Sequence, residues 1–284
     1  MTAEPTNAEK LRLLPWGIGF FATNAVWFYL TFFGSAFVLF LSKLGLQKTE
    51  IGSLLSLLPF SGLIALFITP LIDRWGYKRT FLIACTGRMV FSAFLLPTPW
   101  VLSRFGPQGV LSYITGVVIV FGICRAFSLT ALLPWQQEFV PDSVRGKFAA
   151  VNNIFVSIAG FMAITAGSYL LGSDPTIGRF IILFGIGCGF GLGAIWLITF
   201  IPGGAPAVAT RVQTAPWSKF REAAGDPNFR RYLSGVGLIT LVAGPLASFL
   251  PLFMQEQGGL DSGEAVLLQA GTTIGGLLSS YLWG

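Results

Sequence analysis

Eight long stretches without an acidic or basic side chain, apart from one arginine, constrain this chain more than any other feature. A helix needs about 20 apolar residues to cross a hydrocarbon core of about 30 Å, and the stretches reach that length. Only 11% of the residues are charged, against roughly 25% in soluble domains. We therefore predict an all-α polytopic membrane protein with eight spanning helices. The stretches are Leu13–Ser42, Ile51–Ile72, Phe105–Cys124, Phe148–Ser173, Phe180–Thr210, Tyr232–Gln255 and Ala265–Gly284, with Thr80–Ser103 interrupted only by Arg88.

Composition excludes several kinds of chemistry. The chain has no histidine, which removes the commonest metal ligand and general base. Its three cysteines, Cys85, Cys124 and Cys188, lie inside apolar stretches, where small packing residues are more typical than disulfides. No stretch shows paired acids, a catalytic cysteine constellation or a metal cluster. We therefore expect no enzymatic activity, no cofactor and no bound metal.

Positive charge is distributed unequally over the loops. Of the 18 Lys and Arg residues, twelve lie before the first stretch or in the loops after the second, fourth and sixth, and only four lie in the loops of the other side. The positive-inside rule then places the N-terminus in the cytoplasm, in a plasma or bacterial inner membrane. The net charge of +6 is thus an orientation signal. We expect contacts with membrane lipids and none with nucleic acid.

Two bundles are predicted on either side of a linker. Residues 1–201 would form a six-helix bundle, 202–231 a cytoplasmic linker rich in Pro, Gly and small residues, and 232–284 the start of a second bundle. An ungapped alignment at an offset of 214 residues lays Leu44–Pro70 on Gly258–Gly284, with Gly45 on Gly259 and Glu50 on Glu264. Such a parallel repeat is typical of secondary transporters.

Two charged motifs resemble those of the major facilitator superfamily. "DRWGYKR" after the second stretch is similar to the family's Gly-x-x-x-Asp-Arg-x-Gly-x-Lys/Arg-Lys/Arg signature, although Thr69 replaces the first glycine, and "EFVPDSVRGK" is similar to its Glu-x-x-Pro-x-x-x-Arg-Gly pattern. The resemblance implies a helical bundle that transports solutes, in which these motifs gate one half against the other. The residues it assigns to gating are Asp73, Arg74, Gly76, Lys78, Arg79, Glu138 and Arg145.

The family's bundle has twelve helices, whereas this sequence supplies about eight, so we expect a C-terminally truncated transporter. The implied activity is secondary-active or facilitative transport of a small solute by alternating access. A non-transporting receptor or scaffold on the same fold, or an inactive fragment, is the alternative. A proton or another coupling ion stays open as a partner. The residues themselves do not support coupling, because no apolar stretch contains a carboxylate that could titrate within the membrane.

Polar residues inside the stretches are the candidates for solute binding. Arg125 follows 20 uncharged residues and precedes twelve more, so it cannot easily reach either surface. Because a cation at such depth is costly, we expect it to face the cavity and bind an anionic group, or else to form a structural salt bridge. Asn24, Asn152 and Asn153 would line the same cavity or make interhelical hydrogen bonds.

Three further features have a less specific interpretation. Arg88 would snorkel towards the cytoplasm. The aromatic segment "WFYLTFF", Trp27–Phe33, would face lipid rather than stack on a substrate. Gly185, Gly189 and Gly193 recur at intervals of four, so they would form one closely packed face of their helix.

Overall fold

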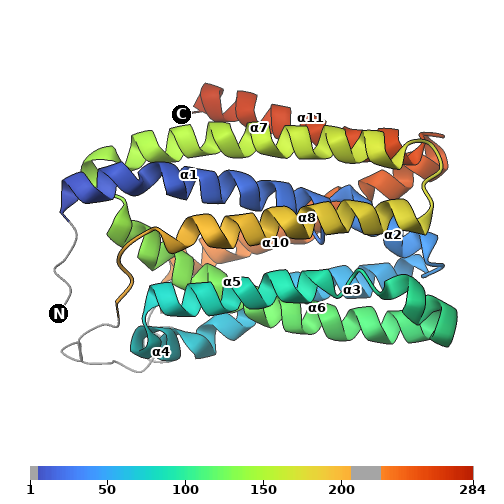
Figure 1. Ribbon diagram of the computed structural model, residues 1–284, viewed down its shortest axis with the longest axis horizontal. Helices are drawn as coiled ribbons and strands as arrows, with labels where there is room; N and C mark the ends of the chain where they lie inside the picture. The colour runs from blue at the N-terminus through green and yellow to red at the C-terminus, as the bar shows by residue number, and fades with distance from the viewer. Residues whose placement is uncertain (1–5, 206–224, 284) are drawn as a thin grey trace.

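The computed structural model describes residues 6–205 and 225–283, without the side chains of Leu66, Pro70, Asp73, Leu241, Gly244, Pro245, Ala247 and 276–283. Within these residues the chain forms helices and short connections, with no strand. The helices lie side by side along the longest axis of the molecule (Figure 1). They are α1 (Asn7–Leu30), α2 (Ser35–Lys43), α3 (Lys48–Phe60), η1 (Ser61–Ile64), α4 (Ala65–Trp75), α5 (Tyr77–Ala93), α6 (Thr98–Phe139), η2 (Asp142–Val144), α7 (Arg145–Leu171), α8 (Ile177–Thr199), α10 (Pro227–Gln257) and α11 (Ser262–Trp283).

Each predicted stretch corresponds to one rod of this bundle, where a rod is a single long helix or a run of consecutive helices that follow one line: α1 with α2, α3 to α4, and then α5, α6, α7, α8, α10 and α11 in chain order. Four rods are long and apolar enough on their own to cross a membrane, namely residues 7–43, 98–139, 142–171 and 177–199. The second rod is divided into the shorter helices α3, η1 and α4. The helix α5 has 17 residues and is slightly shorter than the other single-helix rods. Parts of α10 and α11 lie outside the described side chains. The all-helical membrane fold expected from the sequence is thus confirmed.

The turn between the third and fourth rods lies earlier than predicted. We expected the boundary at Arg104, because that is where charge interrupts the apolar sequence. The chain instead turns at residues 94–97, and Pro99 sits in the first turn of α6, where proline is well tolerated. Arg104 therefore lies within α6, which bends at Gly106 in a conformation with φ 67° that favours glycine. An uncharged turn gives no charge signal, which explains the error.

The first rod is broken two thirds of the way along. α1 ends at Leu30, and residues 31–34 separate it from α2. The Thr31 hydroxyl donates to the Trp27 carbonyl oxygen at 2.7 Å, and Gly34 is extended at φ −86° and ψ 157°. Discontinuous helices of this kind expose backbone groups within the membrane, and such groups are acceptable only where protein or a cavity covers them.

The helices pack around α1, which contacts α7 on one side and α8 on the other. α5 packs against both α6 and α8, whereas α11 lies along α7 and α10 contacts α2 (Figure 1). We call the end of the bundle with residues 73–79 and 138–147 the motif end. The end with loops 44–47, 94–97, 172–176 and 258–261 is called the opposite end.

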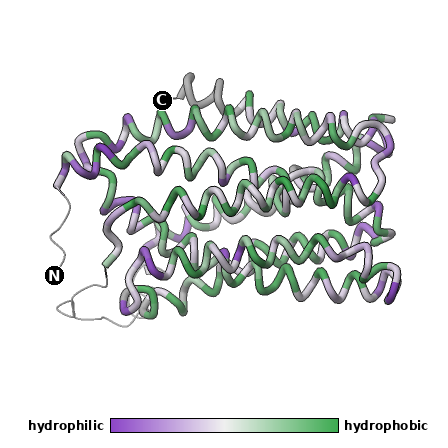
Figure 2. Tube along the Cα trace, viewed as in Figure 1, coloured by the Kyte–Doolittle hydropathy of each residue, from purple (hydrophilic) through white to green (hydrophobic). Residues whose placement is uncertain are grey.

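Large apolar side chains cover the outside of the bundle. Phe67 and Leu133 are each 65% exposed and Trp100 is 63% exposed, whereas hydrophilic residues gather near the two ends (Figure 2). Soluble monomers rarely expose apolar surface on this scale. The pattern fits a protein whose sides contact lipid and whose ends contact water.

The structure preserves the internal repeat at several positions. Gly45 and Gly259, which the offset of 214 residues aligns, both adopt positive φ, at 86° and 66°. α3 and α11 begin at residues 48 and 262, which differ by the same 214. Each of these helices also begins with two reciprocal residues three apart, which satisfy its first backbone N–H groups. These pairs are Gln47 with Glu50, and Asp261 with Glu264.

The predicted linker range of 202–231 includes the start of α10. α10 begins at Pro227, because Asp226 caps it by accepting a hydrogen bond of 2.8 Å from the Asn228 backbone N–H. The charged part of the predicted linker, 206–224, lies outside the described residues. The division into 1–201, 202–231 and 232–284 therefore stays a proposal.

The glycines of α8 pack closely, but on a different face from the predicted one. A Cβ at Gly191 would lie 2.5 Å from Met89 Sδ and 2.9 Å from Trp27 Cδ1, and one at Gly187 would crowd the end of α1. Gly189 and Gly193 have nothing within 4 Å of such a Cβ. The predicted spacing of four residues is correct, but two sets of glycines share it, Gly187 with Gly191 and Gly189 with Gly193. The sequence alone does not say which set faces α1.

Leucine substitutions in α8 test this assignment. Gly191→Leu should lower the free energy of unfolding by about 1–3 kcal/mol, because the added side chain forces α1 and α5 away from α8. Gly189→Leu is the matched control and should be close to neutral, since that position is open. Thermal unfolding of the two purified variants in the same detergent measures the difference. Equal melting temperatures would show that Gly191 is not a close contact.

Candidate functional site

Arg88 lies in the interior of the bundle, so the prediction that it snorkels is wrong. It is eleven residues into α5, or about 17 Å at helical rise, and only 7% of its surface is exposed. Its Nη2 donates to Asn24 Oδ1 at 2.8 Å, and the guanidinium carbon lies 4.6 Å from the centre of the Trp27 ring. The side chain therefore joins α5 to α1 rather than reaching the motif end.

Arg125 occupies the middle of α6 and is half-buried. Its Nη1 donates to the Leu58 carbonyl oxygen at 3.3 Å, beside the point where α3 gives way to η1. Its guanidinium carbon lies 5.2 Å from the centre of the Phe33 ring, which belongs to the break between α1 and α2. Arg125 thus points into the bundle next to its most irregular backbone.

The two arginines have no acidic partner among the described residues. The ion pairs found there are Lys43 with Asp174, Lys48 with Glu256 and Arg145 with Asp142, all near the ends of the bundle. All twelve Asp and Glu residues of the sequence lie outside the apolar stretches. Two deeply placed cations without a carboxylate are unusual, since buried charges are normally paired.

The three candidate asparagines lie in different surroundings. Asn24 holds Arg88, as described above, and so faces the interior. Asn152 on α7 has a buried Oδ1 that no described residue donates to, whereas Asn153 is exposed. Eight residues further along α7, a Cβ on Gly160 would touch Tyr29, so α7 runs alongside α1 at the level of Tyr29. The structure thus brings Asn24 together with Arg88, and it does not group Asn153 with the interior residues.

The aromatic segment of α1 faces the interior and not lipid, contrary to the prediction. Trp27 is fully buried and Phe32 is 2% exposed. Trp27 Nε1 donates to Ser92 Oγ at 3.1 Å, and Phe32 packs on Phe121 with ring centres 4.3 Å apart. Since α1 is surrounded by α5, α6, α7 and α8, its bulky side chains have protein on nearly every side.

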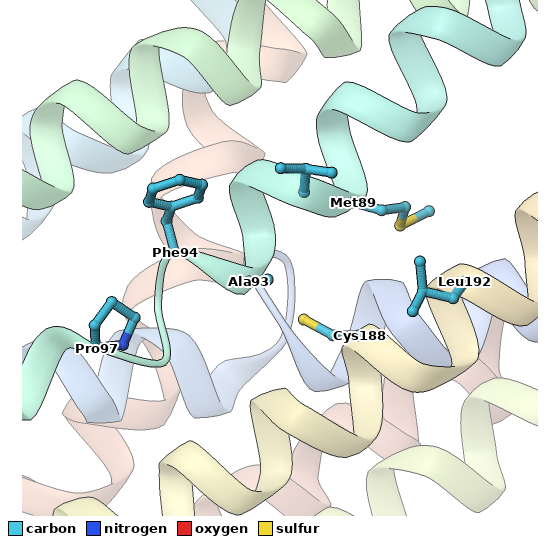
Figure 3. A pocket seen from close by; sticks show the side chains of 7 residues that line it. Met89, Ala93, Phe94, Pro97, Cys188 and Leu192 are labelled. Carbon is cyan, nitrogen blue, oxygen red and sulfur yellow. The ribbon is translucent and has the colours of Figure 1, made fainter.

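An apolar pocket lies apart from these polar groups. It has a volume of about 340 Å³ and lies between α5, α8 and the start of α6. Figure 3 shows Met89, Ala93, Phe94, Pro97, Cys188 and Leu192 along its walls. None of its lining residues is charged, and Phe94 is itself 43% exposed. Such a groove suits an acyl chain at the lipid surface better than a polar solute.

Charged residues of the two sequence motifs hold the motif end together. Lys78 Nζ donates to the carbonyl oxygens of Thr199 at 2.9 Å and Ile201 at 2.6 Å, where α8 ends. A cation at the C-terminus of a helix is favourable, because unpaired carbonyl groups gather there. Glu138 Oε2 accepts from the Gly204 backbone N–H at 2.7 Å. These contacts tie α5 and α6 to the first residues after α8.

The remaining motif residues are placed as follows. Gly76 has φ 86° and forms the tight turn between α4 and α5. Arg74 and Arg79 are exposed at the surface of that turn. Arg145 pairs with Asp142 and donates to the Gln137 carbonyl oxygen at 3.3 Å. The side chain of Asp73 lies outside the described residues.

In the half of the molecule nearer the opposite end, Gln269 connects α11 to α2. Its Oε1 accepts hydrogen bonds from the Ser35 backbone N–H at 2.8 Å and the Ser35 hydroxyl at 2.9 Å. α2 has no cap from its own N-cap residue, Gly34, so Gln269 supplies an acceptor to its first turn. The sequence contains only a weak signal for this role. At the offset of 214 residues, Gln269 aligns with Leu55, so a single polar residue replaces an apolar one.

Other contacts strengthen the same connection. Lys48 Nζ lies 2.5 Å from Glu256 Oε2, and the Ser168 hydroxyl donates to the Gly263 carbonyl oxygen at 2.7 Å. Nearby, within the first bundle, Lys43 donates to Asp174 Oδ1 at 2.7 Å, which lowers the pKa of that carboxyl through the hydrogen bond and the lysine charge. Every described hydrogen bond and ion pair that joins α10 or α11 to residues 6–205 lies at the opposite end or close to it.

The sequence matches the family model of the Major Facilitator Superfamily over residues 18–284. The structure is similar to the solved structure of a D-xylose-proton symporter, with a TM-score of 0.58, 17% sequence identity, and coverage of 96% of this chain and 67% of that chain. No curated protein sequence matches the chain. The family match supports a multi-pass membrane protein that transports a small solute, and the structural match shows a shared fold.

Removing the Gln269 acceptor should loosen the opposite end. Gln269→Leu leaves the first turn of α2 uncapped, so spin labels at positions 176 and 257 should report a second, longer distance. The measurement is double electron–electron resonance on protein in which the three native cysteines have been replaced. Thr272→Val, one turn further along α11 and exposed, is the matched control. An unchanged distance distribution in the Gln269 variant would exclude a latching role.

Proposed function

Because the chain belongs to the Major Facilitator Superfamily, we propose that it moves a small solute by alternating access, as a secondary-active or facilitative transporter. Alternating access needs two bundles that rock about a central site and close at one end at a time. The separation of interactions between the two ends of this molecule supports that mechanism. The motif end carries contacts within the first bundle, and the opposite end carries the contacts between bundles.

We propose further that the structure corresponds to an inward-facing state. Hydrogen bonds and an ion pair join the bundles at the opposite end, whereas every residue of α10 from Pro227 to Thr240 is exposed. The motif end of α10 therefore stands away from the first bundle. If the excess of Lys and Arg marks the cytoplasmic side of a cell membrane, with the N-terminus inside, the open end faces the cytoplasm.

In this proposal the motif residues control closure of the motif end. Lys78 and Glu138 fix the ends of α5, α6 and α8 relative to one another, so these helices should move as one body. Asp73, Arg74, Arg79 and Arg145 lie at the same end, where the second bundle would approach during closure. The resemblance of both motifs to those of the family supports a gating role for this group.

The substrate we propose is anionic or a polar organic molecule. The observation that carries this choice is Arg125, a half-buried cation with no acidic partner among the described residues. Asn24, Asn152 and Asn153 are the other proposed contacts. D-xylose, named for the structural neighbour, is uncharged and would not use an arginine in this way. Proton coupling would require a titrating group, and the apolar stretches contain no carboxylate.

A receptor, a scaffold or an inactive fragment on this fold would show no solute flux. Purified protein in liposomes, tested with radiolabelled small carboxylates, inorganic phosphate and D-xylose, distinguishes these possibilities from transport. Saturable uptake of one of these solutes above protein-free liposomes supports transport. Absence of flux for every probe, with correctly inserted protein, would favour the alternative.

Substitution of Arg125 tests the proposed site. Arg125→Ala should reduce uptake of an anionic solute at least about tenfold, because a charge-assisted hydrogen bond is worth about 1.5–3 kcal/mol. Arg125→Lys keeps the charge and should retain part of the activity. The control is Leu129→Ala, one turn away on α6 and 42% exposed, which should transport normally. Unchanged uptake in both arginine variants would contradict the proposal.

A further inference from the structure

We propose that Arg88 and Arg125 form one binding site for an oxyanion, a carboxylate or a phosphate group carried by the solute. This inference rests on the proposed transport function and adds to it a substrate class and a second binding residue. The site lies between α5 and α6 and is bounded by α1. Arg88 binds the anion from the buried side, and Arg125 binds it from the more accessible side.

Helix packing brings the two arginines together. Gly87 precedes Arg88 on α5, and Cys124 precedes Arg125 on α6. A Cβ at Gly87 would lie 2.9 Å from Cys124 Sγ, so the two helices touch at the residues immediately before the arginines. The two arginines therefore leave α5 and α6 at one level of the bundle, and like charges at one level repel each other.

Few of the N–H donors of the two arginines have an acceptor among the described residues. Two guanidinium groups offer ten N–H donors. Arg88 donates to Asn24 Oδ1 and, weakly, to Cys85 Sγ at 3.7 Å, and Arg125 donates to one carbonyl oxygen. Arg88 Nε is buried and has no acceptor among the side chains and backbone that the structure describes, and only 7% of the residue is exposed. A buried donor without a partner is costly, so an acceptor is expected to arrive with a ligand.

Charge balance indicates what that ligand carries. Two like charges held at one level of a membrane protein destabilise it unless a counter-charge is present. The apolar stretches of this chain supply no carboxylate. An oxyanion has several acceptor oxygens in a small group, so it can accept from both guanidinium groups at once. A neutral sugar would satisfy donors but leave the charges uncompensated.

Aromatic rings hold both guanidinium groups in place. Arg88 lies over Trp27 and Arg125 over Phe33, and both rings pack near Phe121, with centres 6.0 and 5.9 Å away. Stacking leaves the edges of a guanidinium free to donate hydrogen bonds. Asn24 further fixes Arg88. The arrangement therefore presents oriented donors before any ligand binds, which reduces the entropic cost of binding.

A purely structural role for Arg88 is the competing explanation, because its contacts with Trp27 and Asn24 already join α5 to α1. The two explanations differ in one respect. A structural arginine affects stability without ligand, whereas a binding arginine changes the affinity for an anion. The experiment must therefore measure stability and affinity separately for each variant.

Ligand-dependent thermal stability of the full chain measures both. The protein is held in an uncharged detergent at low ionic strength and titrated with inorganic phosphate, with succinate or with D-xylose. The melting temperature without ligand reports folding, and its dependence on ligand concentration gives the dissociation constant. We expect phosphate or succinate to stabilise the protein and D-xylose to have no effect. Which of the two anions binds more tightly distinguishes a phosphate from a carboxylate substrate.

Variants then assign the site. Arg88→Gln and Arg125→Gln should each weaken anion binding about tenfold or more, and Arg88→Lys should weaken it less than Arg88→Gln. Leu129→Ala should bind as the unmodified protein does. If Arg88→Gln unfolds without ligand, Arg88→Lys and Arg125→Gln still test the site through their affinities.

The outcomes separate this inference from the proposed function. Anion binding that survives Arg88→Gln or Arg88→Lys at full affinity would leave Arg88 with a structural role only and overturn the inference, while transport could stand. Failure of both anions to stabilise the unmodified protein would also overturn it. Flux of D-xylose without any anion binding would keep the transport function and reject the oxyanion site. Absence of flux with intact anion binding would reject transport and keep the site.

Discussion

The rest of the structure depends on the contact of Arg88 with α1. The guanidinium group of Arg88 lies over Trp27 and is bonded to Asn24, so α5 is fixed to α1 at a buried position. α1 in turn contacts α7 and α8, and glycines 187 and 191 of α8 allow α1 to approach closely. A polar interaction at the centre thus determines how the surrounding apolar helices are arranged, although apolar burial supplies most of the contact area.

The two ends of the bundle are stabilised in different ways. At the motif end, Lys78 and Glu138 bind backbone groups of the chain after α8, and these contacts lie within one bundle. Nearer the opposite end, Gln269 reaches from α11 to the first turn of α2, so α11 is joined to the first rod at its break. Phe33 lies in that break and also carries Arg125 on its ring. The proposed binding site and the proposed latch therefore share one short segment.

The sequence was sufficient to predict the helical membrane fold, the family and the internal repeat, because these follow from long apolar stretches, from charged loop motifs and from spacing. It was insufficient wherever the answer depended on which side of a helix faces protein. Arg88, the Trp27–Phe33 segment and the glycines of α8 were all assigned to the wrong environment for that reason. The turn at residues 94–97 was missed because it contains no charge. Gln269 was overlooked because its partner, Ser35, lies 234 residues away.

Two positive charges in the middle of the bundle have an electrical consequence. A membrane potential of 100 mV acts on each elementary charge that crosses it with about 2.3 kcal/mol. As the bundles rock, the empty protein would shift its arginine charges within that field, and the voltage would favour one of its two orientations. With a doubly charged anion between Arg88 and Arg125, the moving charges would cancel. The membrane voltage would then act on the return of the empty protein and leave the loaded step almost unaffected.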